Sequence, residues 1–238
     1  FTVSEGAQPV TISIAANDAR GKLDSVISVL NTRVGGRSLL SGAATGTTAL
    51  ASADDMMAQI GAIVATQVSA GGIIAAVDDW FDAPAGGFET SGFLGSQDNV
   101  SPFMLSENER ASLDIKADDQ SIRDTLKGLV LASLVDEQVM AGNPAEQVAL
   151  LQEAGSKLLA SDAAITESRA HVGRVEQQID EARMANSAEG YALEMAKSKI
   201  VSADVYESAA MLTQAQSQLE MIYTLTARLS QLKLSDYL

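Results

Sequence analysis

Apolar residues recur every seven positions through much of the second half of the chain. The members of this first heptad series are Leu151, Leu158, Ile165, Val172 and Ile179. The positions three residues further on hold small or aliphatic side chains, namely Ala154, Ser161, Ser168, Val175 and Ala182. Alternating steps of three and four residues place all these side chains along one stripe of an α-helix. The series therefore predicts a long helix whose stripe packs in a coiled coil or a helical bundle.

The sequence also indicates where this helix begins and how far it extends. Asn143 fits an N-cap, Pro144 the first helical position and Glu146 the third, a combination typical of helix starts. Leu193 and Ile200 continue the same heptad register. We therefore expect a nearly continuous helix from residue 144 to about residue 202.

A second heptad series follows in a shifted register. Its members are Val201, Val205, Ser208, Leu212, Ala215, Leu219, Ile222, Thr226 and Leu229. Asp204, with Glu207 three residues later, resembles a new helix cap within this region. Residues 201–204 are therefore predicted to join two helices. The second helix is expected to assemble through a seam of Val205, Leu212, Leu219, Ile222 and Leu229.

The first part of the chain gives shorter patterns. Residues 1–17 contain a brief alternation of apolar and polar positions, which predicts an irregular or extended lead-in. A helix is expected from Ala19, with an apolar face of Leu23, Val26, Ile27, Leu30 and Val34.

Residues 56–77 carry no charge over 22 positions, which is long enough for a membrane span. Their Gln, Thr, Ser and Gly content favours a buried helix–turn–helix instead.

Residues 82–118 differ from the segments around them. Five of the six Phe and Trp residues of the chain fall between positions 80 and 103, and turn-forming residues interrupt the segment repeatedly. Short strands are predicted at residues 88–93, 100–105 and 111–115. We therefore expect a small β-rich insertion with its own aromatic core.

These patterns predict a mainly α fold and a chain of five parts. An irregular or extended lead-in at 1–17 precedes the N-terminal part of a helical rod domain at 18–81. The β-rich insertion at 82–118 is followed by the C-terminal part of the rod domain at 119–203. A coiled-coil assembly segment at 204–238 ends the chain. The first heptad series is expected to lie in the core of the rod domain.

Charge and composition exclude several classes of function. The net charge of −15 disfavours binding to nucleic acids and to anionic membrane surfaces, since both require clustered Lys and Arg. The chain contains no Cys and one His, which excludes disulfides, thiolate nucleophiles and His-rich metal sites. No catalytic, cofactor-binding or metal-binding residue is predicted, and neither is a cofactor.

Adjacent carboxylates occur three times, as Asp54–Asp55, Asp78–Asp79 and Asp118–Asp119. Two catalytic carboxylates could come from such pairs, so an acidic hydrolase is one alternative class. Helix capping and interaction with the helix dipole explain Asp residues at helix starts more simply. A helical adaptor or secretion-associated coiled-coil protein is another alternative.

Three segments resemble a known family. Residues 31–42, Asn-Thr-Arg-Val-Gly-Gly-Arg-Ser-Leu-Leu-Ser-Gly, resemble the segment that closes an N-terminal rod helix in flagellin-like junction proteins. Residues 201–210 resemble the acidic joint of the flagellin C-terminal helices, and residues 232–238 resemble the end of the hook–filament junction proteins. The chain is thus similar to the flagellin-like hook–filament junction family (hook-associated protein 3). The family's N-terminal partner helix is missing here, so we expect an N-terminally truncated member.

The resemblance implies a fold, a role and a location. It implies an elongated antiparallel helical rod with a small outward β-rich domain, and a structural subunit that joins hook to filament by self-assembly through helical seams. It implies other copies of the chain, the hook, neighbouring hook-associated and filament proteins, and an export chaperone as partners, with no nucleic acid and no membrane insertion. Such proteins are exported unfolded by the flagellar type III route without a cleavable signal peptide, and act outside the cell. A filament flagellin is the alternative within the family.

Overall fold

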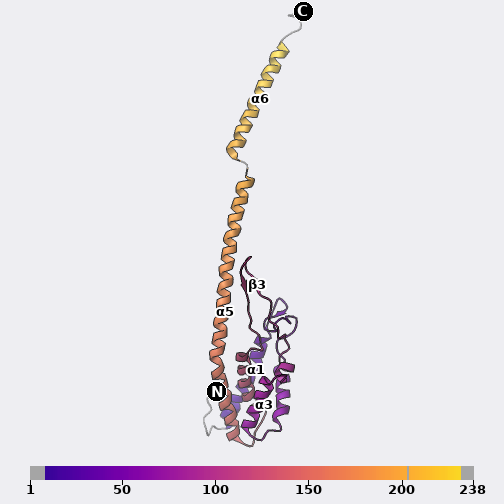
Figure 1. The fold of residues 1–238 in the computed structure, drawn as a ribbon, viewed down its shortest axis with the longest axis vertical. Helices are drawn as coiled ribbons and strands as arrows, with labels where there is room; N and C mark the ends of the chain where they lie inside the picture. The colour runs from indigo at the N-terminus through magenta and orange to yellow at the C-terminus, as the bar shows by residue number, and fades with distance from the viewer. Residues whose placement is uncertain (1–8, 203, 232–238) are drawn as a thin grey trace, which may run out of the picture. The chain divides into compact units, whose positions relative to one another are not determined.

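The structure is a computed structural model that describes residues 9–202 and 204–231. The chain divides into two compact units, residues 1–182 and residues 183–238, and each is described by itself. The helix that carries the first heptad series continues from the first unit into the second (Figure 1).

Helices dominate both units, and this confirms the predicted mainly α fold. The first unit contains α1 (Pro9–Leu30), α2 (Ala53–Val64), α3 (Ala70–Asp82), α4 (Gln120–Asp136) and the first part of α5 (Pro144–Val201). It also contains the short π-helix η1 (Phe88–Gly92) and two antiparallel hairpins, formed by β1 (Arg33–Val34) with β2 (Arg37–Ser38) and by β3 (Phe103–Met104) with β4 (Arg110–Ala111). The second unit contains the rest of α5 and α6 (Val205–Gln231).

The helix α1 begins before the sequence pattern indicated. It starts at Pro9, so the predicted irregular or extended lead-in at 1–17 is wrong for residues 9–17, while residues 1–8 lie outside the described residues. The apparent alternation is part of a helical face, since Ile12 is 3% exposed whereas Val10 and Ile14 are 68% and 64% exposed. The buried side of α1 then continues at helical spacing through Ala16, Ala19, Leu23 and Ile27.

The helix–turn–helix predicted over residues 56–77 is confirmed. Its two helices, α2 and α3, are capped by Ser52 and Ser69, whose hydroxyls accept hydrogen bonds from the backbone N–H groups of Asp55 and Gly72. Their inward faces bury Met56, Met57, Ile60, Val64, Ile73 and Val77. Among the helices described, none combines the length and the apolar character needed to cross a membrane.

The aromatic residues near position 80 join the main core instead of forming one of their own. Phe81 stacks on Phe88 with ring centroids 5.2 Å apart, and Trp80 meets Phe81 edge-on at 4.8 Å. All three, with Phe93, belong to the same buried cluster as the residues of α1 to α4. Rings of this size need more cover than a small insertion offers, and the helices supply it.

The β content of residues 82–118 is smaller than expected. The strand predicted at 88–93 is wrong, because residues 88–92 form the π-helix η1. The strands predicted at 100–105 and 111–115 overlap the hairpin of β3 with β4. Each of these two strands is only two residues long. Phe103, on β3, is half exposed and contributes no aromatic core there.

The first heptad series of α5 lies along the covered side of that helix. Leu151, Ala154, Ser161 and Ala182 are buried, whereas Leu158, Ile165, Ser168, Val172, Val175 and Ile179 are half-buried. Most positions between them are exposed. This burial pattern repeats every three to four residues and stops at Ala182, which is the last buried residue of the described chain.

The helices α4 and α5 approach each other closely at Gly128. A Cβ atom on this glycine would lie 2.7 Å from Cγ of Leu158 and 3.0 Å from the backbone oxygen of Ala154. One turn away, the Thr125 hydroxyl donates to Oγ of Ser161 over 3.1 Å. A residue without a side chain is therefore required for the two helices to pack at this distance.

Ion pairs account for one member of each acid pair. The pairs are Asp54 with Arg20, Asp78 with Lys157, and Asp118 with Arg123. A fourth basic residue, Lys127, is 3% exposed and binds Asp82 at 2.6 Å and Asp124 at 2.7 Å. These contacts tie α3, α4 and α5 together on the surface of the apolar core.

The close approach of α4 and α5 can be tested at Gly128. We expect Gly128→Ala to lower the free energy of unfolding by about 1–3 kcal/mol, because neither the Ala154 carbonyl nor Cγ of Leu158 can move away cheaply. Gly173→Ala is the matched control, since its Cβ would meet nothing within 4 Å. That change should stabilise the helix by up to about 1 kcal/mol. Thermal unfolding followed by fluorescence of the single, buried Trp80 measures both; equal effects would contradict the packing described.

Lys127 predicts a dependence of stability on alkaline pH. Burial lowers its pKa, but the hydrogen bonds to Asp124 and Asp82 outweigh burial and leave the pKa above its ordinary value of 10.5. The folded state therefore holds this proton more tightly than the unfolded state, and the stabilisation is complete below pH 10.5 and lost as pH rises through the folded-state pKa. We expect Lys127→Met to cost about 1–2 kcal/mol at pH 7, since both carboxylates keep partial access to water. Unfolding followed by Trp80 fluorescence measures the difference in the free energy of unfolding between this variant and the unaltered chain. That difference should shrink above pH 10.5; a difference that stays constant with pH would contradict this role.

Candidate functional site

A continuous apolar surface lies exposed along α6. It is formed by the five residues predicted for assembly, Val205, Leu212, Leu219, Ile222 and Leu229, which we call the α6 seam. Their exposed fractions range from 53% to 79%. Every side chain described between residues 205 and 230 is exposed. Within the described residues, nothing covers the α6 seam.

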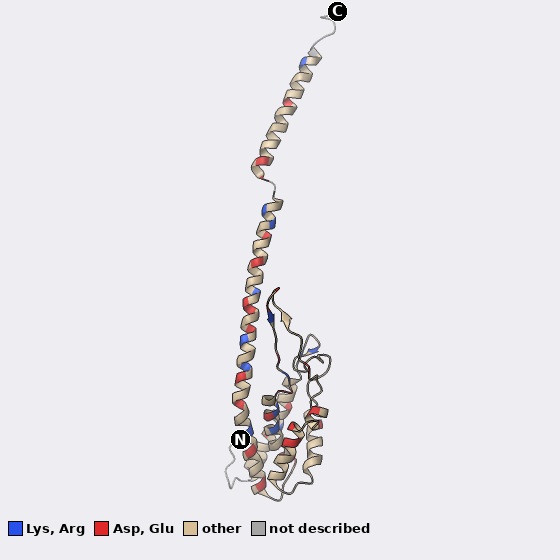
Figure 2. Ribbon diagram, viewed as in Figure 1, with Lys and Arg blue, Asp and Glu red and all other residues tan. Residues whose placement is uncertain are grey.

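The apolar surface is wider than a two-position heptad stripe. Met211 and Tyr223 extend it on its two sides, and both are more than 60% exposed. Only three charged residues, Glu207, Glu220 and Arg228, occur over the length of α6, and Figure 2 shows the helix as almost entirely uncharged. Solvated surfaces normally carry about 25–35% charged residues. The composition of α6 is therefore typical of a helix that buries a broad face against other helices.

A helix cap separates α6 from α5. The carboxylate of Asp204 accepts hydrogen bonds from the backbone N–H groups of Tyr206 at 2.8 Å and Glu207 at 3.3 Å. The predicted new cap at Asp204 is thus confirmed. Because α5 ends at Val201, the second heptad series from Val205 onward lies on a new helix with its own start.

The second half of α5 shares the exposure of α6. After Ala182 the first heptad series continues through Leu193 and Ile200, which are 63% and 85% exposed. The same register that is covered in the first unit is therefore bare in the second. The apolar side chains of the second unit would gain most by contact with another helix, at roughly 0.8 kcal/mol per CH₂ buried.

The segment that resembles the family motif begins with a clamp at Asn31. Its side-chain amide donates to the backbone oxygen of Leu50 over 2.9 Å, and its side-chain oxygen accepts from the backbone N–H of Leu50 over 2.8 Å. The amide thus pairs with Leu50 as a neighbouring strand would. This contact anchors the end of α1 to the loop before α2.

The three glycines of residues 31–42 have positive φ angles, which favour glycine. Gly35 and Gly36 have φ values of +59° and +79° and form the tight turn between β1 and β2. Gly42 has φ +58°, and a Cβ there would lie 2.5 Å from the backbone oxygen of Asp98. The motif therefore builds a hairpin and a close crossing of two loops, with no polar cluster that could carry out a reaction.

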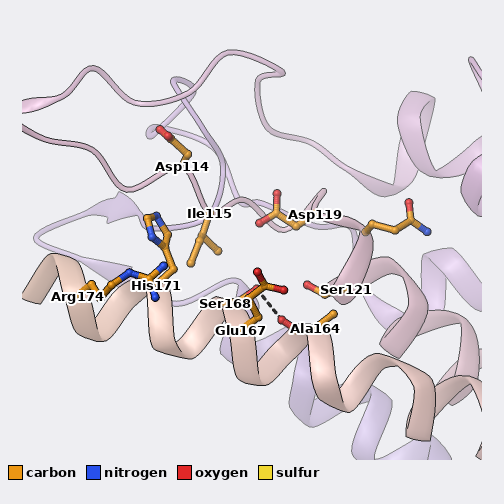
Figure 3. A pocket seen from close by; sticks show the side chains of 10 residues that line it. Asp114, Ile115, Asp119, Ser121, Ala164, Glu167, Ser168, His171 and Arg174 are labelled. Carbon is orange, nitrogen blue, oxygen red and sulfur yellow. Dashed lines mark hydrogen bonds between the residues drawn. The ribbon is translucent and has the colours of Figure 1, made fainter.

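A mixed-charge cleft of about 440 Å³ lies in the first unit between α5 and the segment that leads into α4 (Figure 3). Its lining includes three carboxylates, from Asp114, Asp119 and Glu167, and two basic groups, from His171 and Arg174. Figure 3 shows Arg174 toward one end of the cleft and Ser121 toward the other. The side of α5 that forms its floor is the edge of the covered heptad stripe.

Burial is the main influence on the pKa of Asp119 in this cleft. It raises the pKa of Asp119, and the hydrogen bond from the backbone N–H of Lys116, 3.2 Å long, offsets this only in part. Within the described residues, no group of three His, Asp or Glu side chains is arranged to hold a metal ion. The cleft is therefore a charged surface feature with an acidic excess.

Sequence patterns missed several of these contacts. Lys127 lies among apolar residues of α4, between Leu126 and Gly128, and a single Lys in such a stretch could have indicated an internal ion pair. The clamp at Asn31 and the cleft depend on segments far apart in sequence, and no local signal marks them. The width of the α6 surface was readable from Met211 and Tyr223, which flank the heptad positions.

Comparisons with known proteins identify the region that contains the α6 seam. Residues 160–238 match the model of the bacterial flagellin C-terminal helical region. The match includes the end of the covered α5 stripe and all of α6. Searches of curated proteins and of solved structures each returned no match. The similarity to a flagellin C-terminal helical region is thus shown for residues 160–238.

The Asn31 clamp predicts a large loss of stability when it is removed. Asn31→Ala leaves the backbone N–H and C=O of the buried Leu50 without these partners, and we expect a cost of about 2–4 kcal/mol. Asn31→Asp should also destabilise, because it replaces the donor with a charge facing the Leu50 carbonyl. Asn99→Ala, in an exposed loop, is the control and should leave the unfolding midpoint unchanged. Trp80 fluorescence during thermal unfolding gives all three midpoints, and an unaffected Asn31→Ala variant would show that the clamp contributes little.

Proposed function

We propose that this chain is a structural subunit that joins hook to filament in the bacterial flagellum. The observation that carries the proposal is the α6 seam, a broad exposed apolar face within the region that matches the flagellin C-terminal helical region. A subunit of a polymer needs such a face, because each copy must bury it against neighbours. The family match itself supports a flagellar structural subunit outside the cell.

The α6 seam acts in this proposal by burial and not by chemistry. Its stripe is flanked by Met211 and Tyr223, so the apolar face exceeds the two positions per heptad of a simple two-stranded coiled coil. A face of this width is covered fully only by more than one neighbouring helix. Other copies of the chain, and hook, hook-associated and filament proteins, are the proposed sources of these helices. An export chaperone would cover the same face before assembly.

The junction role, as opposed to a filament role, is supported by sequence resemblance. Residues 31–42 and residues 232–238 resemble the junction family, and the latter lie outside the described residues. The first of these segments forms the β1–β2 hairpin and the Asn31 clamp, which fix the end of α1 in the first unit. We propose export in an unfolded state without a cleavable signal peptide, a route with which the absence of Cys is compatible.

The self-assembly step can be tested by charge placed on or off the α6 seam. Leu219→Asp puts a carboxylate in the centre of the seam, and we expect it to raise the concentration for half-association by at least about tenfold. Ser217→Asp is the matched control, because it adds the same charge on the opposite side of α6. Sedimentation velocity over a concentration series measures both variants. If the two variants associate alike, the α6 seam is not the assembly surface.

A second experiment distinguishes a junction subunit from a filament subunit. The unaltered chain is incubated at high concentration alone, with purified hooks, or with flagellin filament fragments, and then viewed by electron microscopy. A junction subunit should add a limited layer to hook ends and should not grow long filaments by itself. Long filaments from the chain alone would overturn the junction role and leave the flagellar subunit role in place.

A further inference from the structure

The β1–β2 hairpin carries a positive charge, on Arg37, that no described carboxylate neutralises. In the ladder Val34 lies opposite Arg37, so both side chains are on the same face of the hairpin. Leu39 follows two residues after Arg37, directly beyond the end of β2 at Ser38. Val34 and Leu39 are 61% and 53% exposed, and Arg37 is exposed as well. Arg37 forms no ion pair with any described residue.

This positive charge stands out against the rest of the molecule. Residues 25–53 contain two charged side chains, Arg33 and Arg37, and no acid. Residues 51–120 contain 12 acids and two bases, and the whole chain has a net charge of −15. Basic helix residues such as Lys127 and Lys157 are already bound to carboxylates of the first unit. The hairpin face, which consists of Val34, Arg37 and Leu39, therefore combines two exposed apolar side chains with a cation. That cation donates to Oγ1 of Thr45 over 3.3 Å but has no carboxylate partner among the described residues.

The cleft in Figure 3 has the opposite character. None of its three carboxylates, from Asp114, Asp119 and Glu167, is in an ion pair with a described residue, although Arg174 and His171 line the same cleft. Ile115 and Ala164 add apolar surface to its lining. Burial raises the pKa of Asp119, which means that its charged form lacks sufficient compensation there. A guanidinium group between two apolar contacts fits this lining in both charge and polarity.

We propose that the hairpin face of one copy docks into this cleft on a second copy of the chain. Arg37 lies among the carboxylates of Asp114, Asp119 and Glu167, and the side chains of Val34 and Leu39 lie against Ile115 and Ala164. The contact is heterologous, because it joins different surfaces of the two copies. Repetition of such a contact builds a ring or an open helical array and not a closed pair.

This contact goes beyond the α6 seam and rests on the proposed self-assembly only in requiring a second copy. The two contacts respond differently to salt. An ion pair between partly exposed groups weakens as salt screens it, whereas apolar burial does not. The hairpin contact therefore contributes more to association at low than at high concentrations of NaCl.

Charge reversal tests the contact. Arg37→Glu should raise the concentration for half-association by about tenfold at low salt, and the difference should fall at high salt. Arg169→Glu is the matched control, because Arg169 is also exposed and the change in net charge is the same. Combining Arg37→Glu with Glu167→Arg should restore association. The proposal fails if Arg37→Glu and Arg169→Glu behave alike, or if the reversed pair is no better than Arg37→Glu alone.

Cross-linking provides a second readout that depends on proximity. The chain has no Cys, so Leu39→Cys protein mixed with Asp114→Cys protein can form only the intended mixed disulfide or a disulfide between identical variants. We expect the mixed disulfide to form in excess over either identical pair, and Arg37→Glu in the Leu39→Cys chain to suppress it. A random distribution of the three products would overturn the proposal.

The two proposals fail separately. If Leu219→Asp prevents association and Arg37→Glu has no effect, the α6 seam stands and the hairpin contact is wrong. If Arg37→Glu weakens association and Leu219→Asp has no effect, the hairpin contact stands and the α6 seam is not an assembly surface. Trp80 fluorescence establishes that each variant is folded before its association is measured.

Discussion

Burial of one stripe of α5 is the contact on which the first unit depends. From Leu151 to Ile165 this stripe packs against the core built by α1 to α4, and its covered positions continue as far as Ala182. Gly128 allows α4 to approach the stripe closely, and Lys157 ties it to Asp78 of α3. Beyond Ala182 the same helix has no such cover, and α6 continues this exposure with few charges. The first unit thus buries its apolar residues, whereas those of the described part of the second unit lie exposed.

Local signals predicted the long elements well. The α5 helix followed from a heptad repeat with a strong start at Pro144, and the Asp204 cap followed from its spacing to Glu207. Residues 9–17 and 88–92 were predicted wrongly, because their patterns fit two structures and packing decided between them. Ile12 reaches the core only when residues 9–17 are helical, and Phe88 stacks on a ring from α3 that no local pattern reveals.

The α6 seam and the cleft also differ in whether local sequence patterns could predict them. The α6 seam could be named from sequence because its residues share one helix and repeat in register. The cleft could not, because it combines residues near position 115 with residues near position 170, which only the fold brings together. The significance of Arg37 likewise appears when the ion pairs are known, since most basic residues on the helices of the first unit turn out to be occupied.

In the proposed assembly the α6 seam is open in a single copy and covered by neighbouring subunits. Hydrogen exchange of the α6 amides, measured by mass spectrometry over a range of protein concentrations, tests it most directly. The account predicts rapid exchange at low concentration and protection that rises with concentration, while the amides of α4 stay protected throughout. Strong protection of α6 at all concentrations, independent of association, would contradict the account, because the helix would then have a partner within its own chain.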